Sequence, residues 1–442
     1  MNENVDLLIV GTGVAGLFCA LNLPRDKKIL MITKSSIEES DSYLAQGGIC
    51  MMRGEEDYQS YFEDTMKAGH YKNREESVDI MLHSSAEIIR DLVDLGVEFE
   101  RNGEGFIYTR EGGHSKPRIL FHKDITGEEI TKKLLQQVKM LPNVRIIEHL
   151  AMIDLVSRDN VCYGAIGRSE DGTIISIQAA VTVLACGGVG GLYQHSTNYS
   201  HLTGDALAVA MRHRVEVENL DYVQIHPTTL YSQKPGRRFL ISESVRGEGA
   251  LLYNKAGERF TDELMPRDRL SYAIHQQMDE DGMPHVWLSM ENIPEEEIRN
   301  HFPNIYRYCL EEEGLDITRE KIPVVPAQHY FMGGIKVDRH SKTSMEHLYA
   351  VGETSSNGVH GRNRLASNSL LESLVFAKLA ALDIIEGGAA AGNCEKCRQA
   401  WNQIDYAQYE DYETLKDTYK KIIQEETERM AGIHEKSDYH EA

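Results

Sequence analysis

The sequence predicts an α/β fold in which a Rossmann-like domain is interrupted by an inserted segment. A buried-strand pattern over residues 5–10 leads through a glycine-rich turn, residues 11–16, into an apolar helix. Strand and helix patterns then alternate through the first third of the chain, as α/β folds require. Two more apolar strand patterns, at 179–185 and 347–351, also run into glycine, and the last lies far along the chain. We expect one nucleotide-binding domain that is completed late in the sequence.

The predicted domains follow from this interruption. Residues 1–219 and 331–388 are expected to form the nucleotide-binding domain, and residues 220–330 an inserted α+β capping domain. The insertion is rich in histidine, arginine and aromatic residues. A small-residue linker near 387–392 precedes a strongly charged helical pattern. Residues 389–442 are therefore expected to form a short helical segment, a solvated hairpin packed on the main body.

Composition excludes several classes of partner. The chain has 442 residues and a formal net charge of −22, which argues against nucleic acid and against an anionic membrane surface. We find no secretory signal and no apolar run long enough to span a bilayer, so a cytoplasmic location is expected. Seven scattered cysteines suit a reducing compartment. Cys394 and Cys397 form a C-x-x-C pair without further ligands at zinc-like spacing, so no metal is expected.

The first glycine turn has the chemistry of a dinucleotide site. Gly11 permits the tight turn, Gly13 lets a pyrophosphate approach the backbone, and Gly16 lets helix and strand pack closely. The helix N-terminus beyond it offers free N–H groups to phosphates. A nicotinamide site usually has an acidic residue after the second strand, but this strand ends in Thr33 and Lys34.

A flavin explains the remaining turns better than a nicotinamide does. A second glycine turn at residues 42–48 offers backbone N–H groups to an isoalloxazine ring. Glu353, after the late strand, offers a carboxylate to a sugar-alcohol chain. These turns together fit a long cofactor lying across one domain, and we predict FAD.

The insertion and its flanks suggest a site for a small dicarboxylate. Five cationic or imidazole side chains occur in glycine- or proline-containing segments, where loops line clefts: His226, Arg246, Arg267, His329 and Arg364. Arginine provides a forked donor pair for a carboxylate, and histidine adds a shorter reach. The alternative is that these arginines form ordinary surface ion pairs with the abundant acidic residues.

With these motifs, the chain resembles the flavoprotein family of succinate dehydrogenase, fumarate reductase and L-aspartate oxidase. The matching segments occur in the family's order: AQGGI at 45–49, QIHPT at 224–228, SESVRGEGA at 242–250, PRD at 266–268, HYFMGG at 329–334 and NRLASNSLLE at 363–372. The resemblance covers residues 1 to about 390. It implies FAD contacts at Gly11, Thr12, Gly13, Val14, Ala15, Gly16, Lys34, Asp41, Ser42, Gln46, Gly47, Gly48, Asp205, Glu353, Ser369 and Leu370.

The resemblance also implies roles for the polar residues. The substrate carboxylates would be bound by His226, Ser242, His329 and Arg364. Arg267 would donate or accept the proton, and Glu243 and Arg246 would form a proton path that leads to it. An arginine can do this only when it is buried close to other cations and to the substrate, because its pKa in water exceeds about twelve.

Two positions distinguish members of this family. Asp41 occupies the place where membrane-complex members carry a histidine linked to FAD, so the cofactor is expected to be non-covalent. The loop at 108–115 resembles the version found in members that oxidise L-aspartate, with Glu111 as its distinctive acid. A carboxylate there selects aspartate over succinate, because only aspartate carries an ammonium group. The alternative is that Glu111 only pairs with Arg110 or Arg118.

The activity implied is the FAD-dependent oxidation of L-aspartate to iminoaspartate, with reoxidation by O2 or fumarate. In this family that reaction begins quinolinate and NAD synthesis, and a quinolinate synthase consumes the imine. Two alternatives stay open. One is a fumarate-reducing or succinate-oxidising flavoprotein without a membrane anchor. The other is a flavoprotein subunit that acts mainly by docking to an iron–sulfur partner.

Overall fold

A mostly parallel sheet forms the centre of the computed structural model, which describes residues 2–103, 105–387 and 395–441. Four parallel strands lie in the order β7 (Val144–Ile147), β2 (Ile29–Ile32), β1 (Asn2–Val10) and β10 (Ile174–Leu184). The second half of β10 pairs in parallel with β17 (Leu348–Ala350), the late strand. Its first half pairs with the antiparallel strand β9 (Val161–Ser169), which in turn pairs with β8 (Leu150–Arg158).

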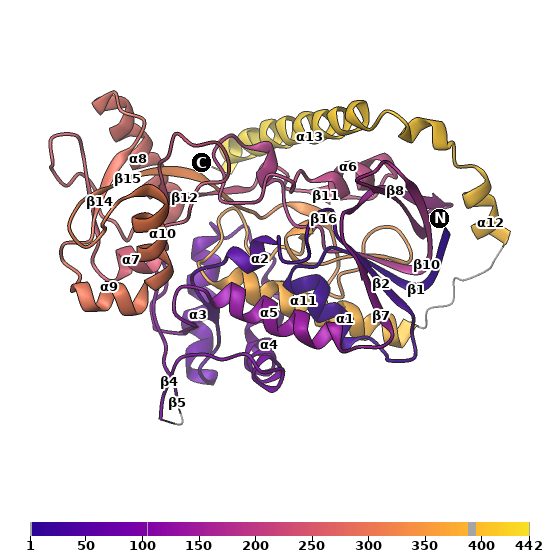
Figure 1. Cartoon of the computed structure of the whole chain (residues 1–442), viewed down its shortest axis with the longest axis horizontal. Coiled ribbons are helices and arrows are strands. Elements are labelled where there is room, and N and C mark those ends of the chain that lie inside the picture. The colour runs from indigo at the N-terminus through magenta and orange to yellow at the C-terminus, as the bar shows by residue number, and fades with distance from the viewer. Residues whose placement is uncertain (1, 104, 388–394, 442) are drawn as a thin grey trace.

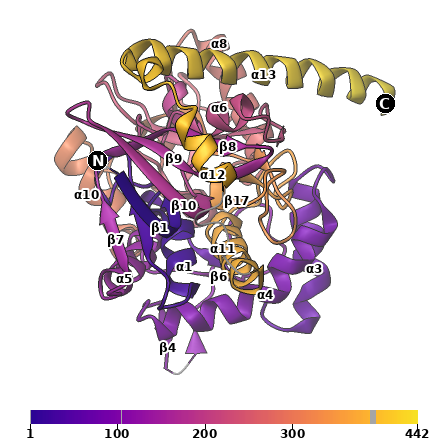
Figure 2. The same ribbon diagram turned by 90° about the vertical axis from the view of Figure 1, so that its right-hand side faces the viewer.

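The two faces of this sheet carry separate hydrophobic cores. Alternate side chains of a strand point to opposite faces: Leu7 and Ile9 of β1 belong to one core, and Leu8 and Val10 to the other. Helices that contribute to the first core include α1 (Val14–Asn22), α4 (Glu75–Asp94), α5 (Thr126–Lys139) and α11 (Asn368–Gly387). The second is covered by β8, β9 and α6 (Asp205–Arg212), as Figure 2 shows.

The glycine turn after β1 is enforced by close backbone contacts. Gly11 has a φ of 115°, and a Cβ on it would lie 1.9 Å from the carbonyl oxygen of Ala185 at the end of β10. A Cβ on Gly16 would lie 2.2 Å from the carbonyl oxygen of Gly11. Only glycine lets the strand ends and the start of α1 approach this closely.

A second sheet lies at one end of the molecule (Figure 1). Its antiparallel strands run in the order β12 (Val223–Leu230), β15 (Ile322–Phe331), β14 (Val286–Ser289) and β13 (Leu251–Tyr253). Four helices accompany it: α7 (Glu243–Gly247), α8 (Arg267–Asp281), α9 (Glu295–His301) and α10 (Pro303–Glu313). Its apolar residues form a third core of their own. These elements occupy the segment for which the sequence predicts a capping domain.

Apart from the C-terminal helices, the remaining elements are α2 (Asp41–Leu44), β3 (Ile49–Cys50), α3 (Glu55–Ala68), β4 (Arg101–Asn102), β5 (Gly105–Phe106), β6 (Ile119–Leu120), η1 (Gly190–Leu192), β11 (Val217–Glu218), β16 (Gly334–Lys336), η2 (Gly352–Thr354) and β18 (Ser355–Ser356). They include three smaller sheets, β11-β16-β18, β3-β6 and β4-β5. Asp124, between β6 and α5, accepts hydrogen bonds from the backbone N–H groups of Asn304 and Ile305 at the start of α10. These hydrogen bonds connect the segment before α5, which packs on the first sheet, to α10, which accompanies the second sheet.

The C-terminal helices belong to the second core. They are α12 (Glu395–Asn402), η3 (Tyr406–Tyr409) and α13 (Tyr412–Glu441), and α13 runs across the top of the molecule in Figure 1. Tyr419 and Ile423 of α13 pack among the buried residues of β8 and α6. The predicted linker at 388–392 and Cys394 lie outside the described residues.

No helix among the described residues is both long and apolar enough to cross a membrane. Within the same ranges, no group of three or more His, Cys, Asp or Glu side chains is arranged to hold a metal ion. All six described cysteines except Cys186 are buried.

Candidate active site

One cavity of about 400 Å³ joins the glycine turns of the first sheet to the facing elements of the second. Most residues that the sequence proposes for FAD line it: Gly11, Thr12, Gly13, Ala15, Lys34, Asp41, Ser42, Gln46, Gly47, Gly48, Asp205, Glu353, Ser369 and Leu370. The same cavity is lined by Glu111, His226, Ser242, Glu243, Arg267, His329 and Arg364. Val14, Gly16 and Arg246 are not among the lining residues. The structure therefore brings both predicted sets together.

At the cofactor end, the wall is mainly backbone. Helix α1 begins at Val14, and its N-cap residue, Gly13, has no side chain that could cap the helix. The Val14 N–H group donates to Ser42 Oγ at 3.3 Å. The second glycine turn is equally crowded, since a Cβ on Gly48 would lie 2.2 Å from the Leu120 carbonyl oxygen. Two buried acceptors that line the cavity, Asp41 Oδ2 and Gln46 Oε1, have no donor among the described residues. A helix N-terminus, bare turns and unpaired acceptors fit a dinucleotide that carries phosphates and hydroxyl groups.

Lys34 does not leave a free positive charge at this end. Its Nζ donates to Asp205 Oδ2 at 2.6 Å and to Thr203 Oγ1 at 2.9 Å. This ion pair joins the end of β2 to the start of α6. Because the lysine is neutralised, an anionic ligand here would depend on backbone N–H groups and on the dipole of α1.

Two carboxyl groups in the cofactor end hold protons more tightly than usual. Burial raises the pKa of Asp41 to about 7, although its bond from Tyr199 N–H acts in the opposite direction. Burial and the nearby Asp41 raise the pKa of Glu353 well above its usual range. Glu353 Oε1 accepts a hydrogen bond from Phe331 N–H at 2.9 Å, which fixes its position. Both groups suit hydrogen bonding to a hydroxyl-bearing ligand.

At the substrate end, Arg267 is the first residue of α8. Its Nε donates to Glu243 Oε2 at 2.6 Å, and its Nη1 donates to Gln224 Oε1 at 2.9 Å. Glu243 begins α7, where Ser242 Oγ caps the helix by accepting from Ser244 N–H. Arg246, one turn further along α7, pairs with the same Glu243 oxygen at 3.7 Å. One carboxylate therefore holds both arginines.

Two histidines face each other from neighbouring strands of the second sheet. His226 on β12 and His329 on β15 have ring centroids 5.1 Å apart. His226 Nδ1 lies 3.1 Å from the Thr228 carbonyl oxygen and 3.2 Å from Thr228 N, and Thr197 Oγ1 lies 2.8 Å from His329 Nδ1. Burial and Arg267 lower the pKa of both imidazoles well below the usual value. They are neutral groups with fixed orientations.

Three buried side-chain nitrogens near the substrate end have no hydrogen bond within the described part of the chain. They are His226 Nε2, Arg246 Nη2 and Arg364 Nε. Arg364 is held through Nη1, which donates to Ser369 Oγ at 3.1 Å. Burial and Arg267 lower the pKa of Arg364 to about 10, so it remains charged at neutral pH. Buried polar nitrogens without a partner are costly, and an anion with two carboxylates could contact His226 and Arg364, which line the cavity.

Glu111 contacts serines rather than arginines. Ser244 Oγ donates to its Oε1 at 2.9 Å, and Ser367 Oγ donates to its Oε2 at 2.6 Å. Burial and the nearby Glu243 raise its pKa. Arg118, which the sequence offered as an alternative partner, instead contacts Asp57 and Asp64. The alternative that Glu111 only pairs with Arg110 or Arg118 therefore finds no support for Arg118, and the hydrogen-bond partners of the Glu111 carboxylate are Ser244 and Ser367.

Sequence reasoning missed the residues that orient the site. Gln224 joins two arginines, because its Oε1 accepts from Arg267 while its Nε2 donates to the Arg364 carbonyl oxygen at 2.8 Å. Thr197 orients His329, and Ser367 orients Glu111. The one available signal was that Gln224 lies two residues before His226 on a strand, hence on the same face.

Comparisons with known proteins agree with this geometry. Residues 6–370 match the family described as the FAD binding domain. The L-aspartate oxidase of Clostridium perfringens is 49% identical over 98% of this chain and 96% of its own length, and that of Clostridium acetobutylicum is 50% identical over 87% and 88%.

A solved structure shares the fold. A mutant form of the Escherichia coli quinol fumarate reductase superposes with a TM-score of 0.85 at 31% identity, over 93% of this chain and 74% of that chain. Together with a family match to most of the chain and near full-length relatives, this decides the assignment. The chain belongs to the L-aspartate oxidase family of FAD-binding proteins.

Proposed function

We propose that this chain is an enzyme that oxidises L-aspartate to iminoaspartate with non-covalently bound FAD. The observation that carries the proposal is Glu111, a buried carboxylate that lines the same cavity as Arg267 and Arg364. L-aspartate has two carboxylates and one ammonium group. The substrate end offers unpaired cationic and imidazole donors for the first two and one acid for the third.

The donors divide between the two carboxylates. We assign Arg364, His226, His329 and Ser242 to carboxylate binding, since each lines the cavity and the first two each have a buried nitrogen without a hydrogen bond. Arginine and imidazole donors give short, directed bonds to carboxylates. Their own partners, Ser369, Thr228 and Thr197, keep these donors in place before the substrate arrives.

Glu111 provides the choice of substrate. The two serine hydroxyls that hold its oxygens leave the carboxylate able to accept from an ammonium group as well. Succinate offers no such cation and would leave the buried Glu111 carboxylate without an ammonium partner. Discrimination therefore rests on an attractive pair for aspartate and a desolvated charge against succinate.

We assign to Arg267 the role of donating or accepting the proton during the reaction. Its Nε and Nη1 are held by Glu243 and Gln224, which leaves Nη2 for the substrate. Glu243 Oε2 lies 2.6 Å from Arg267 Nε and 3.7 Å from Arg246 Nη2, so this carboxylate is placed between the two guanidinium groups, where it could pass a proton from one to the other. The Arg246 Nη1 group donates onward to the Glu263 carbonyl oxygen. The pKa of Arg246 is lowered by burial, which favours such a transfer.

Bound FAD would supply the hydride acceptor and would be reoxidised by O2, giving H2O2, or by fumarate, giving succinate. The residues that would hold it are the glycine turns, Glu353, Ser369 and Leu370 at the cofactor end. Three further points stay predictions: consumption of the imine by a quinolinate synthase in NAD synthesis, a cytoplasmic location, and independence from an iron–sulfur partner.

A fumarate-reducing or succinate-oxidising activity is the second candidate. It is favoured by the structural similarity to the quinol fumarate reductase and by a dicarboxylate-sized set of donors. Glu111 argues against it as the main reaction, because that buried acid has no role toward succinate.

Anaerobic titration of the purified yellow protein tests the proposal. L-aspartate is expected to bleach the flavin absorbance fully, and equimolar succinate is expected to bleach it slowly or not at all. The matched control is Glu111→Gln, which should lose the preference while retaining FAD. Bleaching by succinate alone would favour the second candidate. A colourless protein that cannot be loaded with FAD would contradict both.

A further inference from the structure

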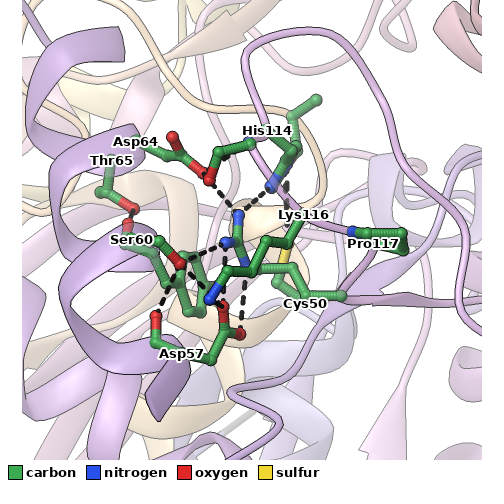
Figure 3. Close-up of polar contacts among 12 residues, drawn as sticks. Cys50, Asp57, Ser60, Asp64, Thr65, His114, Lys116 and Pro117 are labelled. Atoms are coloured by element: carbon green, nitrogen blue, oxygen red, sulfur yellow. Dashed lines mark hydrogen bonds and ion pairs between the residues drawn. The ribbon is translucent and has the colours of Figure 1, made fainter.

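A buried ionic cluster lies directly behind the loop that carries Glu111. We call it the Arg118 cluster; it consists of Asp57, Ser60 and Asp64 of α3 with His114 and Arg118 from the loop and its C-terminal end. Figure 3 shows Asp57, Asp64 and His114 converging on one guanidinium group. The Arg118 side chain is 0% exposed. The reaction proposed above uses none of its members.

All five N–H groups of Arg118 are used. Nε and Nη2 donate to the two oxygens of Asp57 at 3.3 and 3.1 Å, and Nη2 also donates to Ser60 Oγ at 3.1 Å. Nη1 donates to Asp64 Oδ2 at 2.6 Å and lies 3.0 Å from His114 Nδ1. Burial alone would raise the pKa of Asp57, but the bonds and charge of Arg118 hold it below its usual value. The pair is therefore fully ionised and rigidly oriented.

Arg118 decides which nitrogen of His114 carries the proton. A guanidinium can only donate, so His114 Nδ1 must accept, and the proton lies on Nε2. His114 Nε2 is 3.0 Å from the Ala366 carbonyl oxygen and donates to it. Burial lowers the pKa of His114 to about 4, and the charge of Arg118 acts in the same direction. The imidazole is thus neutral, in one tautomer, between α3 and residue 366.

His114 connects the two chain segments that place Glu111. On one side, His114 N–H donates to the Glu111 carbonyl oxygen at 3.3 Å, which closes the turn between them. On the other, Ala366 precedes Ser367, whose hydroxyl donates to Glu111 Oε2 and accepts from Gly48 N–H at 3.2 Å. A single residue therefore holds the backbone of Glu111 and the segment of its hydroxyl partner at a fixed separation.

We propose that His114, oriented by Arg118, is a positioning residue that sets Glu111 for the substrate ammonium group. The inference rests on the proposed function, since it gives Glu111 its role in choosing the amine. It assigns specificity to a cluster that touches neither substrate nor cofactor. Loss of the His114 link should therefore weaken reactions of aspartate and spare those of fumarate, which carries no ammonium.

The test compares two substitutions of the same ring. In His114→Asn the amide oxygen can take the place of Nδ1 and accept from Arg118, but the bond to Ala366 is lost. In His114→Gln the amide nitrogen can take the place of Nε2 and keep that bond. We expect kcat/KM for L-aspartate to fall about tenfold in His114→Asn, mainly through KM, the loss typical of one hydrogen bond. We expect a smaller fall in His114→Gln and a change below about threefold for fumarate reduction in both.

Two controls separate positioning from general damage. His83→Asn removes an exposed imidazole on α4 and should leave both activities unchanged. Flavin content and melting temperature report the folding of each variant. Should His114→Asn fail to retain flavin, Arg118→Lys provides the second route, because three ammonium donors cannot serve both aspartates, Ser60 and His114. It should show the same aspartate-selective loss.

A double-mutant cycle with Glu111→Gln decides the outcome. If His114 acts through Glu111, adding His114→Asn to Glu111→Gln should cause little further loss of aspartate turnover. Equal losses on aspartate and fumarate, or full additivity in the cycle, would overturn the inference. Failure of Glu111→Gln itself to distinguish the two substrates would instead contradict the proposed function, so the two failures are distinguishable.

Discussion

The two ends of the central cavity are built in different ways. At the cofactor end, backbone segments pack closely at glycines such as Gly11 and Gly48, where a Cβ atom would clash with a backbone oxygen. The substrate end is formed by long side chains from separate elements, held by hydrogen bonds such as Arg267 to Glu243. A change at the first end should therefore affect folding and cofactor retention together. A change at the second should affect chemistry while the protein stays yellow.

Gly11→Ala should have the largest effect, because it attacks the cofactor end. The new Cβ would lie 1.9 Å from a backbone oxygen at a φ of 115°. We expect loss of bound FAD and a destabilisation of roughly 3 kcal/mol or more, measured by flavin absorbance and thermal unfolding. Gly257→Ala is the matched control, with a φ of 83° but open space around the Cβ. Equal behaviour of the two variants would show that the close contact is unimportant.

Arg267→Lys should have the next largest effect and belongs to the substrate end. Lysine keeps the charge but cannot hold Glu243 and Gln224 while presenting a third nitrogen. We expect FAD content close to that of the unmodified protein and a kcat reduced by roughly a thousandfold, as for loss of a proton-transfer group. Normal turnover would remove Arg267 from the mechanism.

Glu111→Gln should show a smaller, substrate-specific effect. An amide cannot neutralise an ammonium group, so kcat/KM for L-aspartate should fall by roughly a hundredfold. Fumarate reduction should change only a fewfold, because fumarate carries no cation. Steady-state assays in both directions give the ratio. Equal losses would mean that Glu111 has only a structural part.

The smallest expected effect is on how the free energy of unfolding depends on pH. The pKa of His114 lies at about 4 in the folded protein and about 6.5 in an unfolded chain. Between these values the unfolded state binds the extra proton, so stability rises with pH across this window and falls as pH drops towards 4.

His114→Gln should make that pH dependence less steep by about one proton. Urea unfolding at several pH values between the folded and unfolded pKa values of His114 measures it. The slope will not vanish, because burial also lowers the pKa of His226, His329 and His360. An unchanged slope would show that His114 titrates normally.

The same contrast explains what the sequence could predict. The turn after β1 is local, so the strand, the glycines and the start of α1 at Val14 could be placed from neighbouring residues alone. The late strand predicted at 347–351 also joins the central sheet, as β17. Its short apolar run is typical of a strand that is buried in a parallel sheet. Prediction worked where the determining contacts lie within a few residues.

Contacts between distant residues could not be derived in this way. Residue patterns left open whether the arginines form surface pairs, but Arg246, Arg267 and Arg364 are all less than a tenth exposed. Nothing near Gln224 in sequence indicates that it joins Arg267 to the segment of Arg364. The C-terminal segment is another example: residue patterns predict a solvated helical hairpin packed on the main body, but they do not indicate that Tyr419 and Ile423 of α13 join the core that contains Leu8 and Val10 of β1.

One thiol in the cavity wall bears on how long such an enzyme survives its own chemistry. Cys186 lines the cavity and is only partly buried, but desolvation by the surrounding protein raises its pKa to about 12. Peroxide attacks the deprotonated sulfur, and oxidation beyond the first stage is irreversible. H2O2 formed in this cavity by the proposed reaction would therefore meet a thiol that stays protonated at neutral pH. The protein thus carries a cysteine in the cavity wall without carrying a reactive thiolate there.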